Sequence, residues 1–183
     1  MRRFTEGFYG YAVALLVCVA AAGLFLLITP QSREEHIPRL DYTITVANFN
    51  RAVPYQVWGP AKDPVDWVPN SNRIAKGDKG ADVLYLGYAT DKRGGDTRAH
   101  AMFAQSGEQP AAAFASRLAN TDKAAGTQQI GGQAWERRFR EDKNQRSLIR
   151  FLPDTTLIVT GTADWDQLAT YAATLKLHPK PTS

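Results

Sequence analysis

Cysteine is nearly missing from this chain of 183 residues, and its scarcity limits the kind of protein that the sequence can encode. The single cysteine, Cys18, lies inside an apolar stretch, so the segment 31–183 contains none. A disulfide framework is therefore excluded for that segment, and its stability must come from side-chain packing. A lipid-modified Cys18 is also disfavoured, because Leu15, Leu16 and Val17 leave no small residue directly before it. We interpret Cys18 as a small apolar side chain.

The residue patterns that catalysis or metal binding needs are missing as well. Neither the G-x-S-x-G elbow of hydrolases nor an S-x-x-K motif occurs, and Gly77-Asp78-Lys79-Gly80 lacks the spacing of a phosphate-binding loop. The histidines have no cysteine or carboxylate neighbours at metal-ligand spacing. Two carboxylate pairs occur, and solvation or helix capping explains them better than acid–base work; they are Asp63 with Asp66 and Asp164 with Asp166. We therefore expect no enzyme, no cofactor and no metal site.

Charge is absent from one long stretch, Tyr11 to Thr29, which reads YAVALLVCVAAAGLFLLIT. As a helix this stretch would be about 28 Å long, close to the ~30 Å thickness of the hydrocarbon core of a bilayer. A cleaved signal peptide is the alternative. Its apolar core would be shorter, and its small residues would follow the apolar run instead of lying within it, as Ala20 to Gly23 do. The sequence thus predicts an uncleaved transmembrane helix over 11–29 that contacts the lipid bilayer.

The orientation of this helix depends on the residues that flank it. Arg2 and Arg3 precede the apolar stretch, and Arg33 and Arg39 follow it, so the count of positive charges is equal on the two sides. The free amine adds charge to the short side, and long domains translocate largely regardless of their own charge. We therefore expect residues 1–10 to be a cytoplasmic tail. The chain would be a single-pass protein of the cell membrane, with its domain outside.

The remaining chain has the organisation of a stem, a single domain and a tail. Residues 30–40, PQSREEHIPRL, are polar and bounded by prolines, as in a short stem. Residues 41–178 have the length of one extracytoplasmic domain, and we expect 179–183 to be disordered. From residue 31 onward, 20 basic and 17 acidic residues give a net charge of +3. That charge is too mild to indicate nucleic acid as a partner.

The first half of the domain is expected to contain strands and a proline-rich loop. Residues 41–47 alternate apolar and polar side chains, which favours a half-buried strand, with a helical start as the weaker alternative. One helical turn over 48–53 would end at Pro54. The segment 54–69 contains four prolines, so it should wrap the domain as an ordered loop that Trp58 and Trp67 hold in place. A strand is expected around 70–75.

A hairpin and a helix are expected next. Residues 82–90 and 97–106 flank a glycine pair that suits a hairpin turn. Both alternating sets of the first strand are largely apolar, which indicates a central strand covered on both faces. A helix should open at 107–110 and bury Phe114 and Leu118.

The C-terminal part is expected to be a meander followed by a helix. Residues 128–141 form a strand interrupted at Gly131-Gly132 by a tight turn or a bulge, and strands over 146–152 and 155–162 follow. Asp164 and Gln167 have the spacing of a capping box. The last helix would bury Trp165, Leu168, Ala169, Ala172 and Leu175. The order of elements predicts the α+β class, an antiparallel sheet packed with two helices as a sandwich.

Several short motifs resemble one known family. They are Leu40-Asp41-Tyr42, Trp67-Val68-Pro69, Leu86-Gly87-Tyr88-Ala89-Thr90 and Gly131-Gly132-Gln133-Ala134-Trp135, which follow a single N-terminal apolar helix. Together they resemble the actinobacterial membrane-anchored proteins of domain-of-unknown-function family 4245. The resemblance implies an anchored domain that faces the cell envelope, without established catalytic residues. The element order also resembles the Mog1/PsbP-like sandwich, a fold used for binding, by analogy of fold alone.

Basic residues crowd one predicted hairpin and form the first candidate site. Between residues 136 and 150 the chain has six basic and three acidic residues. Guanidinium groups suit carboxylate and phosphate, so this hairpin is a candidate face for an anionic partner. A solvated hairpin with cross-strand ion pairs is the alternative. The candidate residues are Arg137, Arg138, Arg140, Lys143, Arg146 and Arg150.

Two functions from different classes follow. The first is a membrane-anchored, non-catalytic interaction or scaffold protein of the cell envelope, whose partner would be anionic lipid, a wall polymer or an envelope protein. The second is a module that binds a small molecule or lipid in an apolar pocket between helix and sheet. That pocket would be lined by Tyr85, Phe103 and Trp135.

Overall fold

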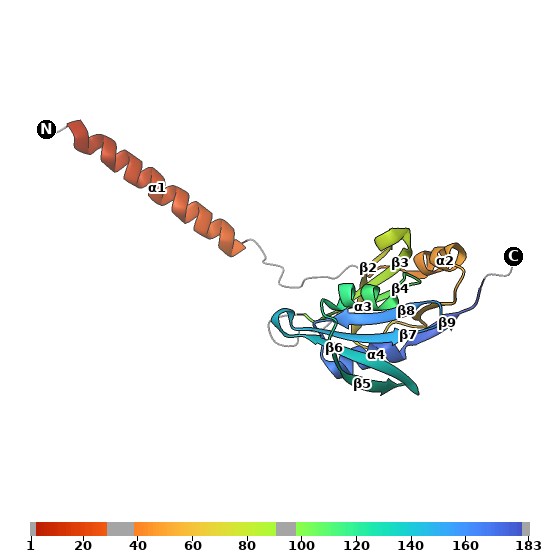
Figure 1. Cartoon of the computed structure of the whole chain (residues 1–183). Helices are drawn as coiled ribbons and strands as arrows, with labels where there is room; N and C mark the ends of the chain where they lie inside the picture. Colours follow the sequence, from red (N-terminus) through yellow and green to blue (C-terminus); the bar gives the residue numbers. More distant parts are fainter. Residues whose placement is uncertain (1–2, 29–38, 91–97, 181–183) are drawn as a thin grey trace. The chain divides into compact units, whose positions relative to one another are not determined.

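The computed structural model describes residues 3–28, 39–90 and 98–180, and it divides the chain into two compact units, 1–36 and 37–183. The first unit contains helix α1 (Arg3–Ile28), and the second is an α+β domain (Figure 1). The described side chains of α1, at positions 10–25, are all exposed. Within the described residues, no helix has the length and apolar character required to cross a membrane.

A seven-stranded antiparallel sheet forms the framework of the domain, in the order β2-β3-β4-β8-β7-β6-β5. Its strands are β2 (Trp67–Lys76), β3 (Asp82–Thr90), β4 (His100–Ser106), β5 (Ala124–Ile130), β6 (Gln133–Arg140), β7 (Gln145–Phe151) and β8 (Thr156–Gly161). A second sheet pairs β1 (Val57–Pro60) with β9 (Leu175–His178), also antiparallel. The expected antiparallel sheet is therefore present, and the two-stranded sheet is an addition that the sequence did not indicate.

Helices cover both faces of the large sheet. On one face α3 (Ala111–Ala119) contributes Phe114, Ala115 and Ala119 to a core with Val83 and Ile158. On the other face, α2 (Thr43–Ala52) and α4 (Trp165–Ala173) pack in a larger core with alternate residues of β3. The described domain thus has three α-helices, not the expected two. Two short 3-10 helices, η1 (Asp78–Gly80) and η2 (Glu141–Lys143), complete it.

Helix α2 replaces the strand that we expected over 41–47. Ile44, which the alternating pattern assigned to the core, is 71% exposed, whereas the buried residues are Val46, Phe49, Asn50 and Val53. These four follow the three- and four-residue spacing of a helix, so this longer pattern overrides the short alternation. The carboxylate of Asp41 accepts a hydrogen bond from the amide of Thr43 (2.8 Å), which satisfies a free donor at the start of α2.

Residues 179 and 180 are more ordered than expected, and 181–183 lie outside the described residues. We expected disorder from residue 179, but the side chain of Asn50 donates to the carbonyl of Pro179 (2.8 Å). The ammonium of Lys180 donates to the carbonyls of Asn50 (2.8 Å) and Val53 (2.6 Å). A cation at a helix C-terminus satisfies the unpaired carbonyls and the helix dipole. Lys180 therefore holds the C-terminal segment against α2.

The local predictions in the middle of the chain are confirmed. Strands β3 and β4 pair as a hairpin, and its turn, 91–97, lies outside the described residues. Val83 and Leu84 are both fully buried, so β3 is covered on both faces as predicted. Gly131 and Gly132 have positive φ angles of 57° and 76° and form the tight turn between β5 and β6, which settles the choice between turn and bulge.

The last helix follows its predicted pattern at most positions. Asp164 and Gln167 form both hydrogen bonds of the predicted capping box. Leu168 and Ala172 are buried as expected, and Trp165 and Ala169 are partly buried. Leu175 is buried in β9 and not in the helix, and the sequence pattern missed Tyr171, which is fully buried.

Candidate functional site

The six basic residues of the predicted anionic-partner face do not form one surface. They lie on or between β6 and β7, and successive residues of a strand point to opposite faces of a sheet. Arg138, Arg140 and Lys143 contact α3 and the residues that follow it, whereas the remaining three lie on the face that α4 covers. These three are Arg137, Arg146 and Arg150.

Arg138 is buried and paired, which corrects its assignment to a docking surface. The residue is only 5% exposed. Its Nε donates to Oε1 of Glu136 (2.6 Å), and its Nη1 donates to Oγ of Ser116 and to the carbonyl of Thr121, both at 3.0 Å. Arg138 therefore fastens β6 to α3 and to the loop after it. A buried guanidinium with every bond directed inward cannot serve an external partner.

Arg140 and Lys143 are exposed, and protein groups on the same face satisfy part of their hydrogen-bonding capacity. Arg140 pairs with the carboxylate of Asp142 and donates to the carbonyl of Asn120 (2.9 Å). That partner holds the pKa of Asp142 below its usual value. Lys143 donates to Oδ1 of Asn120 (3.2 Å). This part of the hairpin matches the alternative of a solvated hairpin with local ion pairs.

The three arginines on the α4 side each lie over an aromatic ring. The distance from the guanidinium carbon to the ring centroid is 3.8 Å for Arg137 over Trp165, 5.1 Å for Arg146 over Phe139 and 5.0 Å for Arg150 over Trp58. Cation–π contacts of this kind are attractive and leave the edges of the guanidinium available for other bonds. Within the described part of the chain, no carboxylate forms an ion pair with any of these three arginines.

The expected pocket of Tyr85, Phe103 and Trp135 does not exist as a common cavity. Phe103 is fully buried in the larger core, whereas Tyr85 packs at the edge of the α3-side core, on the opposite face of the sheet. Arg73 covers the ring of Tyr85, with its guanidinium carbon 4.7 Å from the centroid. Trp135 lines a pocket on the α4 side of the domain.

Trp135 and Arg150 meet in a pocket of about 340 Å³ between α4, β9 and the β5–β7 end of the sheet, which we name the tryptophan pocket. Trp58 of β1 and Lys176 of β9 also line it. Apolar side chains form much of the remaining wall. The other lining residues are Ile130, Gly131, Gln133, Ala172, Ala173, Leu175 and Leu177.

The position of Trp58 is set by the backbone of β1. Its amide donates to Oε1 of Gln105 (2.8 Å), and Nε2 of Gln105 donates to the carbonyl of Gln56 (2.7 Å). Gln105 is fully buried on β4, so its amide acts as a fixed clamp on the strand that carries Trp58. On the other side, β1 pairs with β9 and places Trp58 opposite Leu177.

The charged side chains that line the tryptophan pocket, Arg150 and Lys176, are both basic. Nη2 of Arg150 donates to Oε1 of Gln133 (2.7 Å), and burial lowers the pKa of the guanidinium, which still stays charged at neutral pH. Among the described residues, neither Arg150 nor Lys176 has a carboxylate partner, and Nε1 of Trp58 is buried without an acceptor. The polar groups Arg150, Lys176 and Trp58 all supply donors. The pocket can therefore receive an acceptor-rich or anionic group.

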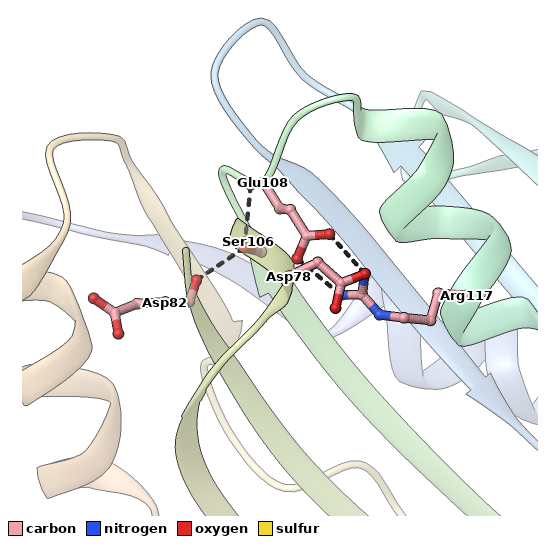
Figure 2. Close-up of polar contacts among 5 residues, drawn as sticks. All are labelled: Asp78, Asp82, Ser106, Glu108 and Arg117. Atoms are coloured by element: carbon pink, nitrogen blue, oxygen red, sulfur yellow. Dashed lines mark hydrogen bonds and ion pairs between the residues drawn. The ribbon is translucent and has the colours of Figure 1, made fainter. Parts of the chain in front are cut away.

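A second polar cluster, which sequence reasoning missed, serves the fold. Figure 2 shows the carboxylate of Glu108 facing the guanidinium of Arg117 on α3, with bonds of 2.6 and 2.8 Å, while Asp78 contacts the same guanidinium at 2.7 Å. The amide of Glu108 donates to Ser106, whose hydroxyl donates to the carbonyl of Asp82. The hydrogen bonds to the Glu108 carboxylate, together with the negative charges of Glu108 and Asp78, raise the pKa of Arg117. No local sequence pattern predicts the pairing of Glu108 with Arg117, which are nine positions apart.

Metal binding and relatives complete the description of the site. No group of histidine, cysteine, aspartate or glutamate side chains in the described ranges could hold a metal ion.

The model of a family described as "Protein of unknown function (DUF4245)" matches residues 3–175, which include α1 and the domain as far as the first residue of β9. No curated protein and no solved structure matches the chain.

Arg138 and Arg140 should respond differently to the same substitution. We expect Arg138→Gln to lower the free energy of unfolding by roughly 1–3 kcal/mol, because it removes a buried charged donor and leaves Glu136 without its partner. Arg140→Gln, the matched control on an exposed site, should change it by less than about 0.5 kcal/mol. Chemical denaturation of the two variants measures both values. Equal, small effects would show that Arg138 does not hold β6 to α3.

Proposed function

The chain belongs to the DUF4245 family of proteins of unknown function, and we propose that it is a non-catalytic ligand-binding module of the cell envelope. Its ligand would be a small molecule or lipid fragment with an anionic head and a short apolar body. The observation that carries this proposal is the tryptophan pocket, where Arg150 and Lys176 lack carboxylate partners in the described chain beside walls of tryptophan, leucine and isoleucine.

The chemistry of the pocket supports this class of ligand. Its volume of about 340 Å³ falls within the range of about 300–1,000 Å³ that is usual for small-molecule sites. Charge-assisted bonds from Arg150 and Lys176 would bind phosphate or carboxylate, and a guanidinium suits both in a bidentate geometry. The rings of Trp58 and Trp135 would cover an apolar body and exclude water. The lining residues that the structure describes include no carboxylate, which disfavours a cationic ligand.

Membrane attachment through residues 11–29 is part of the same proposal. The stretch contains no charged residue, and it continues past position 25, the last α1 side chain that the structure describes. Apolar side chains on successive positions of α1 are exposed, among them Leu15 (69%) and Leu16 (71%). A helix that is apolar on all sides needs an apolar surrounding, which lipid supplies. We propose that residues 1–10 lie in the cytoplasm and that the domain lies outside.

A scaffold function without a small ligand is the second candidate. The observation that favours it is the packed larger core, where Phe103, Leu84 and Leu168 are fully buried in one cluster. In that case the exposed Arg140 and Lys143 would contact an anionic lipid, a wall polymer or an envelope protein. The two candidates differ in whether a small anionic molecule alone binds saturably.

Hexyl phosphate tests the proposed ligand class on the full-length chain held in nanodiscs of zwitterionic lipid. We expect it to change tryptophan fluorescence saturably, because Trp58 and Trp135 line the pocket. Inorganic phosphate and 1-hexanol should each bind about tenfold or more weakly, because each lacks one half of the ligand. Arg150→Gln should weaken hexyl phosphate binding by about tenfold.

The matched control for Arg150→Gln is Arg146→Gln, on the same strand and the same face but over Phe139 and outside the pocket. It should leave the affinity for hexyl phosphate unchanged. Binding that both substitutions weaken equally would indicate a general charge effect. A chain that responds to none of the three probes would refute the pocket and favour the scaffold function.

The orientation is tested with reporters fused after Ser183. We expect a reporter that is active only outside the cytoplasm to be on, because the long domain should translocate while the short tail stays inside. A reporter that works only in the cytoplasm, fused at the same residue, is the control and should be off. The reverse pattern would contradict both the orientation and the assignment to the cell envelope.

A further inference from the structure

A second pocket lies between α2 and the two-stranded sheet, and the proposed function does not use it. Its volume is about 440 Å³. Helix α2 contributes Thr43, Val46, Ala47, Asn50 and Arg51, which the helical repeat places on neighbouring rows, and β9 contributes His178. We name this pocket the α2 groove. It shares no lining residue with the tryptophan pocket.

Two buried polar atoms at the wall of the α2 groove lack partners in the described chain. Asn50 is 5% exposed, and its Oδ1 accepts no hydrogen bond, while Nε2 of His178 is likewise unpaired. The orientation of the Asn50 amide is determined, because its Nδ2 donates to the carbonyl of Pro179 (2.8 Å). An exchanged amide would place two acceptors against each other. Burying such atoms without partners costs free energy, which a bound ligand would recover.

The backbone around the α2 groove is arranged to hold these two side chains. Lys180 bonds to the carbonyls of Asn50 and Val53 and so fixes the end of α2. His178 packs directly against Gly59 of β1, where a Cβ atom would lie 2.9 Å from Nε2. Any larger residue at position 59 would therefore displace the imidazole. Glycine at this position leaves the space that His178 occupies.

The groups that line the α2 groove select a chemical class. Asn50 offers an acceptor, His178 offers a ring nitrogen, and the exposed guanidinium of Arg51 bonds only to Asn48 (3.2 Å) among the described residues. Adjacent hydroxyl groups both donate and accept, so they would satisfy Asn50 and His178 together. None of the described residues that line the groove carries a carboxylate to receive an ammonium group. We propose that the α2 groove binds an acidic saccharide, with hydroxyls toward Asn50 and His178 and the acidic group toward Arg51.

Glucuronate is the probe, titrated onto the full-length chain in zwitterionic nanodiscs and followed by saturation-transfer NMR. We expect saturable binding that is stronger than that of glucose, which lacks the acid, and that of acetate, which lacks the hydroxyls. His178→Gln should weaken glucuronate binding by about tenfold. His100→Gln is the matched control, because His100 is exposed and lies outside the groove, and it should have no effect.

Arg51→Gln provides a second test on an exposed residue that does not support the core. It should remove the preference for glucuronate over glucose and leave glucose binding unchanged. Thermal unfolding of each variant verifies that it is folded. Binding of acetate as strong as that of glucuronate would reduce the site to an anion contact and overturn the proposal. No binding of glucuronate, or equal losses in the His178 and His100 variants, would overturn it as well.

Discussion

Both pockets depend on how the two-stranded sheet is held over the larger one, and the buried side-chain amide of Gln105 forms hydrogen bonds that hold it there. Gln105 accepts from the amide of Trp58 (2.8 Å) and donates to the carbonyl of Gln56 (2.7 Å) from within β4. Strand β1 carries β9 with it through their antiparallel pairing. Trp58 and Leu177 then form part of one pocket, while Pro60 and His178 form part of the other.

The charges of the domain are distributed by the alternation of its strands. On the α3 side, Arg138 and Arg117 are paired with Glu136 and Glu108, so their charges stabilise the fold. On the α4 side, arginines lie over aromatic rings, without carboxylate partners in the described chain. Because each guanidinium there is held by a ring and not by an anion, its charge stays available. The arginines of the α4 side are therefore better candidates for binding an anionic ligand than those of the α3 side.

Sequence patterns predicted the elements whose signals are local. The β3–β4 hairpin, the Gly131-Gly132 turn and the capping box at Asp164 each depend on residues close together in the chain. The prediction of a strand at the start of the domain was wrong. A short alternation over 42–46 competed there with a helical spacing that continues to Val53. The candidate arginine face was also inferred from closeness along the chain. Successive residues of a strand point to opposite faces of the sheet, so Arg137 and Arg138 lie on different faces.

The pockets themselves could not be predicted, because their walls come from remote segments. Trp58 and Arg150 are far apart in the chain, yet the fold places the guanidinium of Arg150 over the ring of Trp58. Trp135 and Arg150, which the sequence assigns to two separate candidate sites, both line the tryptophan pocket. No sequence pattern indicated that Lys176, His178 or Asn50 lines a pocket. Each becomes a candidate only through its neighbours in the folded domain.

Hydrogen–deuterium exchange of the full-length chain, wild type against Gln105→Met, tests the central claim that this clamp builds both pockets. Methionine keeps the volume but removes all three hydrogen bonds of the amide, which join it to Trp58, Gln56 and Thr155. We expect faster exchange at the amides of β1 and β9, such as Trp58 and Leu177, with unchanged protection in β5 to β8, since stability is distributed locally. Unchanged exchange in β1 and β9 would show that the small sheet is held by other contacts and would contradict the account.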